Sequence, residues 1–279
     1  MKFNDYTFSR EEIADRIRIV SATAFAEAEY RKALETVFRC IDLTTLEGTD
    51  HDQRIQEFCQ KARDYQAGSE GLSVAAVCVY MPFVRLAAKL LNQTGIEVAT
   101  VACSFPSGQL PLHLKLAEVS WVAGEGADEI DMVISRGKML AGDFHGVLHE
   151  IQAVKAACGK ARLKVILETG ELKSIGMIRK ASELAILGGA DFLKTSTGKV
   201  QPAATAEAVV VMLDTIKEYY DKCGIQIGLK PAGGIAEPQD ALLYYQLVQA
   251  IVGEKWLEKQ WFRIGASRLA DKIYSLLVS

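Results

Sequence analysis

The chain has 279 residues, of which 49% are hydrophobic and 24% are charged, and its formal net charge at pH 7 is -3. The net charge is slightly negative, and the sequence has no cluster of basic residues of the kind that nucleic-acid binding needs, so we expect no nucleic-acid partner. The N-terminal residues lack the apolar core of a signal peptide, and the most apolar run, residues 72–84, is too short for a membrane helix and contains Pro82. We therefore expect a cytoplasmic globular protein with no membrane partner.

The first 39 residues are predicted to be helical and to precede the repeating part of the fold. Ile13 and Ile17 recur at helical spacing, and Ser9 can cap the helix together with Glu12 three residues later. We expect residues 1–39 to form a helical extension that either covers the floor of the main domain or contacts another subunit. A homo-oligomer is therefore possible.

From Cys40 onward, short runs rich in β-formers alternate with longer amphipathic runs. Such alternation is typical of parallel βα units, and eight of them close a TIM barrel, a fold of about 250 residues. No low-complexity linker interrupts the series, so residues 40–279 are interpreted as one (β/α)8 barrel, with an open doubly wound sheet as the alternative. The expected strands are Cys40 to Thr45, Ser73 to Tyr80, Glu97 to Cys103, Glu129 to Ile134, Leu163 to Glu168, Asp191 to Lys194, Gln226 to Lys230 and Phe262 to Gly265.

Side-chain alternation within the strands supports closure into a barrel. In the fourth strand Ile130 and Met132 alternate with Glu129 and Asp131, so one face is apolar and the other is polar. We expect the apolar faces to meet the outer helices and the small or polar residues to fill the lumen. The seventh strand has the same pattern, with Ile225, Ile227 and Leu229 on one face and Gln226, Gly228 and Lys230 on the other.

Two lysines end neighbouring strands at the mouth of the predicted barrel: Lys194 ends the sixth, and Lys230, followed by Pro231, ends the seventh. A lysine has a pKa of about 10.4 in water and is protonated at neutral pH. Two inward ammonium groups at one level disfavour each other, and one then becomes a neutral nucleophile. The pair suggests Schiff-base chemistry, with either lysine as nucleophile. A solvent-exposed position beyond each strand is the alternative.

Carboxylates from other strands are expected in the same lumen. Asp131 could hold one amine charged and pass protons through a water molecule, or it could form a purely structural salt bridge. Asp42, on the inward face of the first strand, is a second candidate for this proton network. Glu129 and Glu168 could serve as internal ion-pair partners.

Glycine-rich tripeptides follow the last three expected strands, where barrels commonly bind phosphate through backbone amides. Their common position at the mouth predicts a phosphate site, although a Gly-Gly pair after a strand often forms only a turn. Lys199 could instead contact a substrate hydroxyl. The predicted phosphate-binding residues are Thr197, Gly198, Lys199, Gly233, Gly234 and Ser267.

The segments around Lys194 and Lys230, with residues 126–131 (Gly-Ala-Asp-Glu-Ile-Asp) and residues 264–267 (Ile-Gly-Ala-Ser), resemble the deoxyribose-phosphate aldolase family. The likeness extends from about residue 40 to residue 269, and the motifs occur in the same order. It implies a class I lyase without metal or cofactor that cleaves 2-deoxy-D-ribose 5-phosphate to acetaldehyde and D-glyceraldehyde 3-phosphate. It also implies that Lys194 forms the imine and that Asp131 and Lys230 relay protons.

Two features depart from the family pattern. Arg268 follows Ser267 where the family has another serine, which either weakens the phosphate contact or replaces it with a cation. Some members also have a longer tail whose terminal tyrosine assists proton transfer, whereas this chain stops at Ser279 and Tyr274 is expected in the core of the last helix. The alternatives are another class I aldolase or a transaldolase, or a non-catalytic barrel that binds a phosphosugar.

Overall fold

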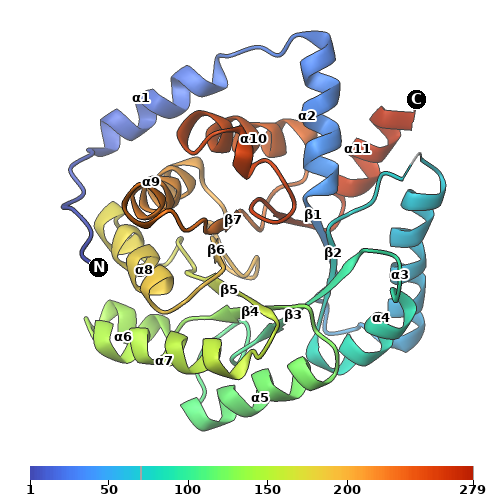
Figure 1. Ribbon diagram of the computed structural model, residues 1–279, viewed down its shortest axis with the longest axis horizontal. Helices are drawn as coiled ribbons and strands as arrows, with labels where there is room; N and C mark the ends of the chain where they lie inside the picture. The colour runs from blue at the N-terminus through green and yellow to red at the C-terminus, as the bar shows by residue number, and fades with distance from the viewer. Residues whose placement is uncertain (70, 279) are drawn as a thin grey trace.

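Eight parallel strands form a closed barrel surrounded by helices in the computed structural model, which describes residues 1–69 and 71–278 (Figure 1). Neighbouring strands pair in the order β7-β6-β5-β4-β3-β2-β1-β8. Each overlaps one predicted strand. The strands are β1 (Ile41–Thr44), β2 (Ala76–Val79), β3 (Glu97–Ala102), β4 (Glu129–Val133), β5 (Arg162–Ile166), β6 (Phe192–Lys194), β7 (Gly228–Lys230) and β8 (Ile264–Ala266).

Backbone hydrogen bonds between β7 and the segment that enters β8 close the barrel. The amide of Leu229 donates to the carbonyl of Trp261 at 2.8 Å, and the amide of Arg263 donates to the carbonyl of Leu229 at 2.9 Å. Just after β7, the carbonyl of Pro231 accepts from the amide of Gly265 in β8 at 2.9 Å. The fold is therefore a TIM barrel, and the open doubly wound alternative is wrong.

Helices separate the strands and form the outer layer. Two helix starts follow from local sequence, because Asp143 caps α7 by accepting from the amide of Gly146 at 2.9 Å and Pro238 is the first residue of α10. The barrel helices are α3 (Asp52–Ala67), η1 (Met81–Phe83), α4 (Val84–Leu90), α5 (Leu112–Gly124), α6 (Arg136–Leu140), α7 (Phe144–Ala157), α8 (Ile175–Leu187), α9 (Ala206–Cys223), α10 (Pro238–Ile251), η2 (Glu254–Trp256) and α11 (Leu269–Val278).

The N-terminal segment forms two helices, α1 (Arg10–Ser21) and α2 (Glu27–Arg39), instead of one continuous helix. The predicted capping box is present, because the amide of Glu12 donates to Ser9 Oγ at 3.2 Å and the amide of Ser9 donates to the Glu12 carboxylate at 2.7 Å. Helix α1 packs against α9 and α10, and α2 packs against α10 and α11. The two helices thus lie along the outside of the helix layer, not across the barrel floor (Figure 1).

The expected alternation holds in β4, where the carboxylates of Glu129 and Asp131 are buried in the lumen while Ile130 and Met132 belong to the apolar core. It fails at the start of the seventh strand. The strand begins only at Gly228, and Ile225 lies outside it with 52% of its surface exposed. Gly228 is required for space, since a Cβ atom there would lie 2.3 Å from the ring of Phe192.

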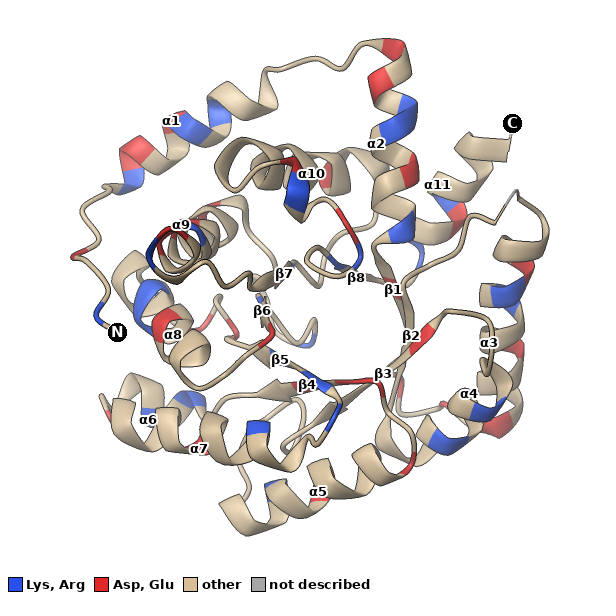
Figure 2. Cartoon of the chain, viewed as in Figure 1, with Lys and Arg blue, Asp and Glu red and all other residues tan. Residues whose placement is uncertain are grey.

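Charged residues fall into two groups. On the outer helices, basic and acidic residues are interspersed, and a second set lies on the strands inside the barrel (Figure 2). Of the six cysteines, five are buried and Cys223 is exposed. No described helix is both long enough and apolar enough to cross a membrane.

One carboxylate attaches the N-terminal segment to α9, and its removal should destabilise the protein. Asp214 accepts from Tyr6 at 2.7 Å and from both terminal nitrogens of Arg16 at 2.7 Å. We expect Asp214→Ala to lower the free energy of unfolding by about 2 kcal/mol, because it leaves two partly buried donors unpaired. Asp221→Ala on the same helix removes an exposed pair with Lys217 and should cost less than about 1 kcal/mol. Urea unfolding of both variants measures this, and equal losses would contradict it.

Candidate active site

Lys194 and Lys230 lie side by side at the ends of β6 and β7, where they are register partners in the parallel ladder. Their side chains are buried, with 3% and 1% of the residue surface exposed. Both Nζ atoms donate to the same oxygen, Oδ2 of Asp131, at 2.7 Å. The structure therefore brings together the three residues that the sequence predicts as a catalytic group, and it excludes a solvent-exposed position for either lysine.

The surroundings of Lys194 disfavour its charge. Burial lowers the pKa of the Lys194 amine, the cation of Lys230 lowers it further, and the Asp131 carboxylate only partly opposes these effects. A lowered pKa increases the fraction of neutral amine near pH 7. Lys194 therefore has the property that a nucleophilic lysine needs.

The surroundings of Lys230 have the opposite effect. Burial alone would lower its pKa, but the carboxylates of Asp131 and Asp42 raise it well above the ordinary lysine value. Oδ2 of Asp42 lies 2.5 Å from the Lys230 ammonium. Asp42 thus distinguishes the two lysines, because it pairs with Lys230 and is not bonded to Lys194. Strand geometry alone allowed either lysine to be the nucleophile, and this contact assigns Lys194 as the neutral amine.

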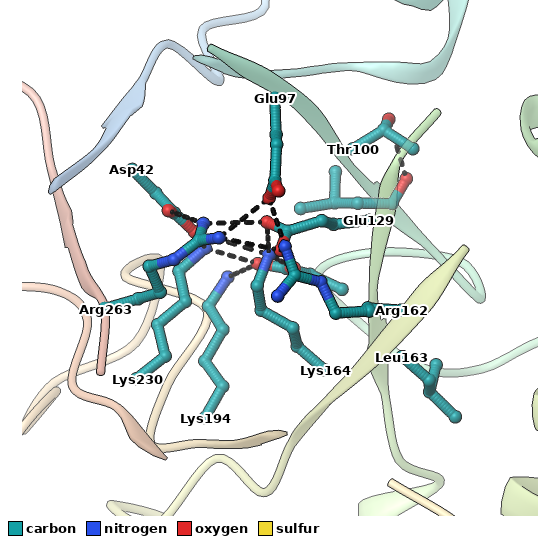
Figure 3. Close-up of polar contacts among 12 residues, drawn as sticks. Asp42, Glu97, Thr100, Glu129, Arg162, Leu163, Lys164, Lys194, Lys230 and Arg263 are labelled. Atoms are coloured by element: carbon teal, nitrogen blue, oxygen red, sulfur yellow. Dashed lines mark hydrogen bonds and ion pairs between the residues drawn. The ribbon is translucent and has the colours of Figure 1, made fainter. Parts of the chain in front are cut away.

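Two further cations, which the sequence patterns did not single out, complete the cluster (Figure 3). Lys164 on β5 donates to Glu129, lies 3.1 Å from Oδ1 of Asp131 and 3.4 Å from Oδ2 of Asp42. Arg263, just before β8, pairs with Asp42 and Glu129. A signal for Lys164 was present in the sequence, because its position places a charge on the inward face of the fifth strand.

The resulting network contains five basic and four acidic side chains. Burial raises the pKa of Glu129, and the cations of Lys164 and Arg263, which donate to its oxygens, only partly oppose this rise. Arg162 forms an ion pair with Oε1 of Glu129 at 3.0 Å. Among these basic side chains, Lys194 has the fewest carboxylate partners in the described part of the chain, with Asp131 alone. The network comprises the carboxylates Asp42, Glu97, Glu129 and Asp131 and the cations Arg162, Lys164, Lys194, Lys230 and Arg263.

A cavity of about 220 Å³ opens from Lys194 towards the barrel mouth. Gly198, Gly233 and Gly234 line it with φ angles of +79°, +85° and +78°, which glycine adopts most readily. Within residues 1–69 and 71–278 no acceptor is bonded to the amides of Gly233 and Gly234. Consecutive free amides of this kind form a concave site for an anion.

The other predicted phosphate residues also line the cavity, but two of them have protein partners. The amide and hydroxyl of Thr197 both donate to Glu168, which is buried and also pairs with Arg136 at 3.4 Å. Lys199 reaches across the mouth, where Nζ donates to the carbonyl of Leu46 at 2.6 Å. These contacts fix the loop after β6 in place.

Ser267 and Arg268 contribute the β8 side of the cavity. Both are exposed at the N-terminal end of α11, and the Arg268 guanidinium has no ion-pair partner among the described residues. Thr44 from β1 also lines the cavity and was not among the predicted site residues. Tyr274 is partly buried on α11, where its ring packs against Phe38 and Tyr65.

Comparison with known proteins gives consistent results. Residues 36–262 match the family described as DeoC/LacD family aldolase. The chain is 43% identical over 244 residues to human deoxyribose-phosphate aldolase, covering 84% of this chain and 77% of the human protein. It is 39% identical over 279 residues to a putative deoxyribose-phosphate aldolase of Caenorhabditis elegans, covering 97% and 92% of the two chains.

The crystal structure of a putative deoxyribose-phosphate aldolase from Coccidioides immitis superimposes with a TM-score of 0.74 at 27% identity, covering 97% of this chain and 98% of that chain. The match to the family model spans most of the barrel strands and includes Asp131, Lys194 and Lys230. The chain therefore belongs to the DeoC/LacD family of aldolases.

Proposed function

We propose that this protein is a class I aldolase that reversibly cleaves 2-deoxy-D-ribose 5-phosphate to acetaldehyde and D-glyceraldehyde 3-phosphate. The observation that carries the proposal is the single oxygen of Asp131 that binds both Lys194 and Lys230 at 2.7 Å, next to the cavity. The names of the related proteins supply the substrate. The geometry supports a buried neutral amine on Lys194 beside Lys230, which keeps its proton.

The reaction begins when the neutral Nζ of Lys194 attacks the C1 aldehyde of the open-chain sugar. The carbinolamine loses water to give an iminium ion. The C3 hydroxyl then gives up its proton, the C2–C3 bond breaks with its electrons moving to the iminium, and glyceraldehyde 3-phosphate leaves. The remaining enamine is protonated at C2 and hydrolysed, which releases acetaldehyde and restores Lys194.

Asp131 and Lys230 perform the proton transfers in this scheme. The Asp131 carboxylate accepts from Nζ of both lysines, and the cations around it, with Lys164 the strongest, hold its pKa well below the ordinary value against the effect of burial. It can accept the C3 proton through a water molecule, and Lys230 can return a proton during dehydration and enamine protonation. Asp42 keeps Lys230 charged between these steps.

The phosphate is proposed to bind at the outer end of the cavity. Gly233, Gly234, Ser267 and Arg268 all line this cavity and offer backbone amides, a hydroxyl and a guanidinium as donors. Arg268 then replaces a family serine with a cation that can bind a phosphate oxygen pair. A cytoplasmic location and a homo-oligomeric state remain predictions from the sequence.

Borohydride reduction in the presence of 2-deoxyribose 5-phosphate tests the covalent step. We expect a reduced adduct on Lys194, detected by peptide mass spectrometry. Lys194→Met should abolish the adduct and turnover, yet leave the thermal midpoint nearly unchanged, because the remaining network is balanced in charge. Sugar binding with no adduct would support a non-catalytic binding barrel, and an adduct only with other phosphorylated donors would support a different class I aldolase.

Lys230→Leu tests the electrostatic role of the second lysine. Removing its positive charge leaves Asp42 and Asp131 with fewer partners, so the pKa of Lys194 should rise by about one unit or more. The pH at which imine trapping reaches half its maximal rate should move upward by the same amount. Lys230→Arg keeps the charge and is the control. An unchanged profile in Lys230→Leu would rule out this role.

Arg268→Ser tests the phosphate contact. We expect KM for 2-deoxyribose 5-phosphate to rise about tenfold with little change in kcat, since a charge-assisted hydrogen bond contributes roughly 1.5–3 kcal/mol. Steady-state kinetics with unphosphorylated 2-deoxyribose should show no difference from the unmodified protein. Lys272→Ser, on the same helix but paired with Glu237 at the surface, should leave both substrates unaffected. An unchanged KM in Arg268→Ser would remove Arg268 from the site.

A further inference from the structure

Arg263 is completely buried and contacts three carboxylates. Nη1 donates to Oδ1 of Asp42 at 2.6 Å and to Oε2 of Glu129 at 2.9 Å. Nη2 donates to Oε1 of Glu129 at 3.0 Å and to Oε2 of Glu97 at 2.8 Å. The remaining nitrogen donates to the carbonyl of Lys259. Every face of the guanidinium is therefore occupied by protein.

Arg263 does not line the cavity, so it has no route to a bound substrate. It acts on the lysines through Asp42, whose Oδ1 binds Arg263 and whose Oδ2 binds Lys230 at 2.5 Å. Figure 3 shows Arg263 between Asp42 and Glu129, with Lys230 and Lys194 directed towards the same carboxylate cluster. Because Arg263 neutralises part of Asp42, that carboxylate offers less negative charge to the amines.

Charged and titratable groups face Lys194 from most of the barrel. Most of these side chains are buried, so their charges interact more strongly than they would in water. They are Asp42 on β1, Cys78 on β2, Glu97 on β3, Glu129 and Asp131 on β4, Arg162 and Lys164 on β5, Lys230 on β7, and Arg263 before β8.

We propose that Arg263 is a positioning residue that keeps the Lys194 amine free of its proton by supplying the fourth permanent cation to the four carboxylates of this network. With Arg263 present, the carboxylates are balanced without Lys194. Without it, the network has one uncompensated negative charge in a low-dielectric interior, and protonation of Lys194 is the available way to compensate it. The inference rests on the proposed function for its consequence, but the charge balance can be measured without any sugar.

Competitive labelling with acetic anhydride measures the protonation of Lys194 directly. The whole protein is pulsed with the reagent across a pH series beside a reference amine, and acetylation of Lys194 is quantified by peptide mass spectrometry. For Arg263→Met we expect the labelling midpoint to move upward by about one pH unit or more. Arg263→Lys, which keeps the charge, should stay near the original midpoint.

A compensating variant separates charge from packing. In Arg263→Met/Glu129→Gln one cation and one carboxylate are removed together, so the midpoint should return towards that of the unmodified protein. A purely structural role for Arg263 predicts no such return. The control is Arg179→Met, which removes another buried arginine, paired with Glu183 and Glu218 on the outer helices. It should lower stability without moving the Lys194 midpoint.

Two results would overturn the inference: a folded Arg263→Met protein with an unchanged midpoint, or a double variant whose midpoint stays high. If Arg263→Met alone does not fold, the double variant is compared with Glu129→Gln, and removal of Arg263 must again raise the midpoint. A normal labelling midpoint together with no borohydride adduct would instead count against the proposed aldolase function, so the two failures are distinguishable.

Discussion

The chemistry of this protein depends on one carboxylate oxygen that is shared by two amines inside a closed barrel. Oδ2 of Asp131 lies 2.7 Å from both Nζ of Lys194 and Nζ of Lys230. One oxygen cannot fully compensate two buried ammonium groups, so the protein must place a second carboxylate beside one of them or leave one amine neutral. Asp42 is placed beside Lys230, and Lys194 is the amine that remains.

The barrel provides this arrangement through its strand register. Lys194 and Lys230 are paired in the β6–β7 ladder, Asp131 is paired with Lys164 in the β4–β5 ladder, and Asp42 reaches the lumen from β1. A shift of one residue in any of these strands would direct the charged side chain into the apolar helix layer. The hydrogen bonds that close β7 against the segment before β8 thus serve both the fold and the site.

The cavity next to this network differs from it in the pairing of its polar groups. Its rim is formed by the loops after β6, β7 and β8, where the amides of Gly233 and Gly234 and the guanidinium of Arg268 have no partner among the described residues, whereas the floor is a set of paired charges. This division suits a phosphorylated carbonyl compound, whose dianion needs donors at the mouth and whose carbonyl needs a neutral amine deeper in. Glu168 and Leu46 hold the connecting loop by accepting from Thr197 and Lys199.

The sequence by itself determined the eight strands and the position of the three central site residues. Alternation within a strand and the turn residues after it are local properties, and parallel strands align their carboxyl ends, so Lys194 and Lys230 could be placed at one level, and Asp131 in the same lumen, without coordinates. Only the tertiary structure decided which cations and carboxylates meet across the lumen. Lys164, Arg263 and Asp42 are far apart in the chain and become neighbours only when the barrel closes, and the same closure places α1 and α2 outside the helix layer. The protonation of Lys194 is set by that whole group of charges, because electrostatic interactions in a buried interior act over the width of the barrel and not along the chain.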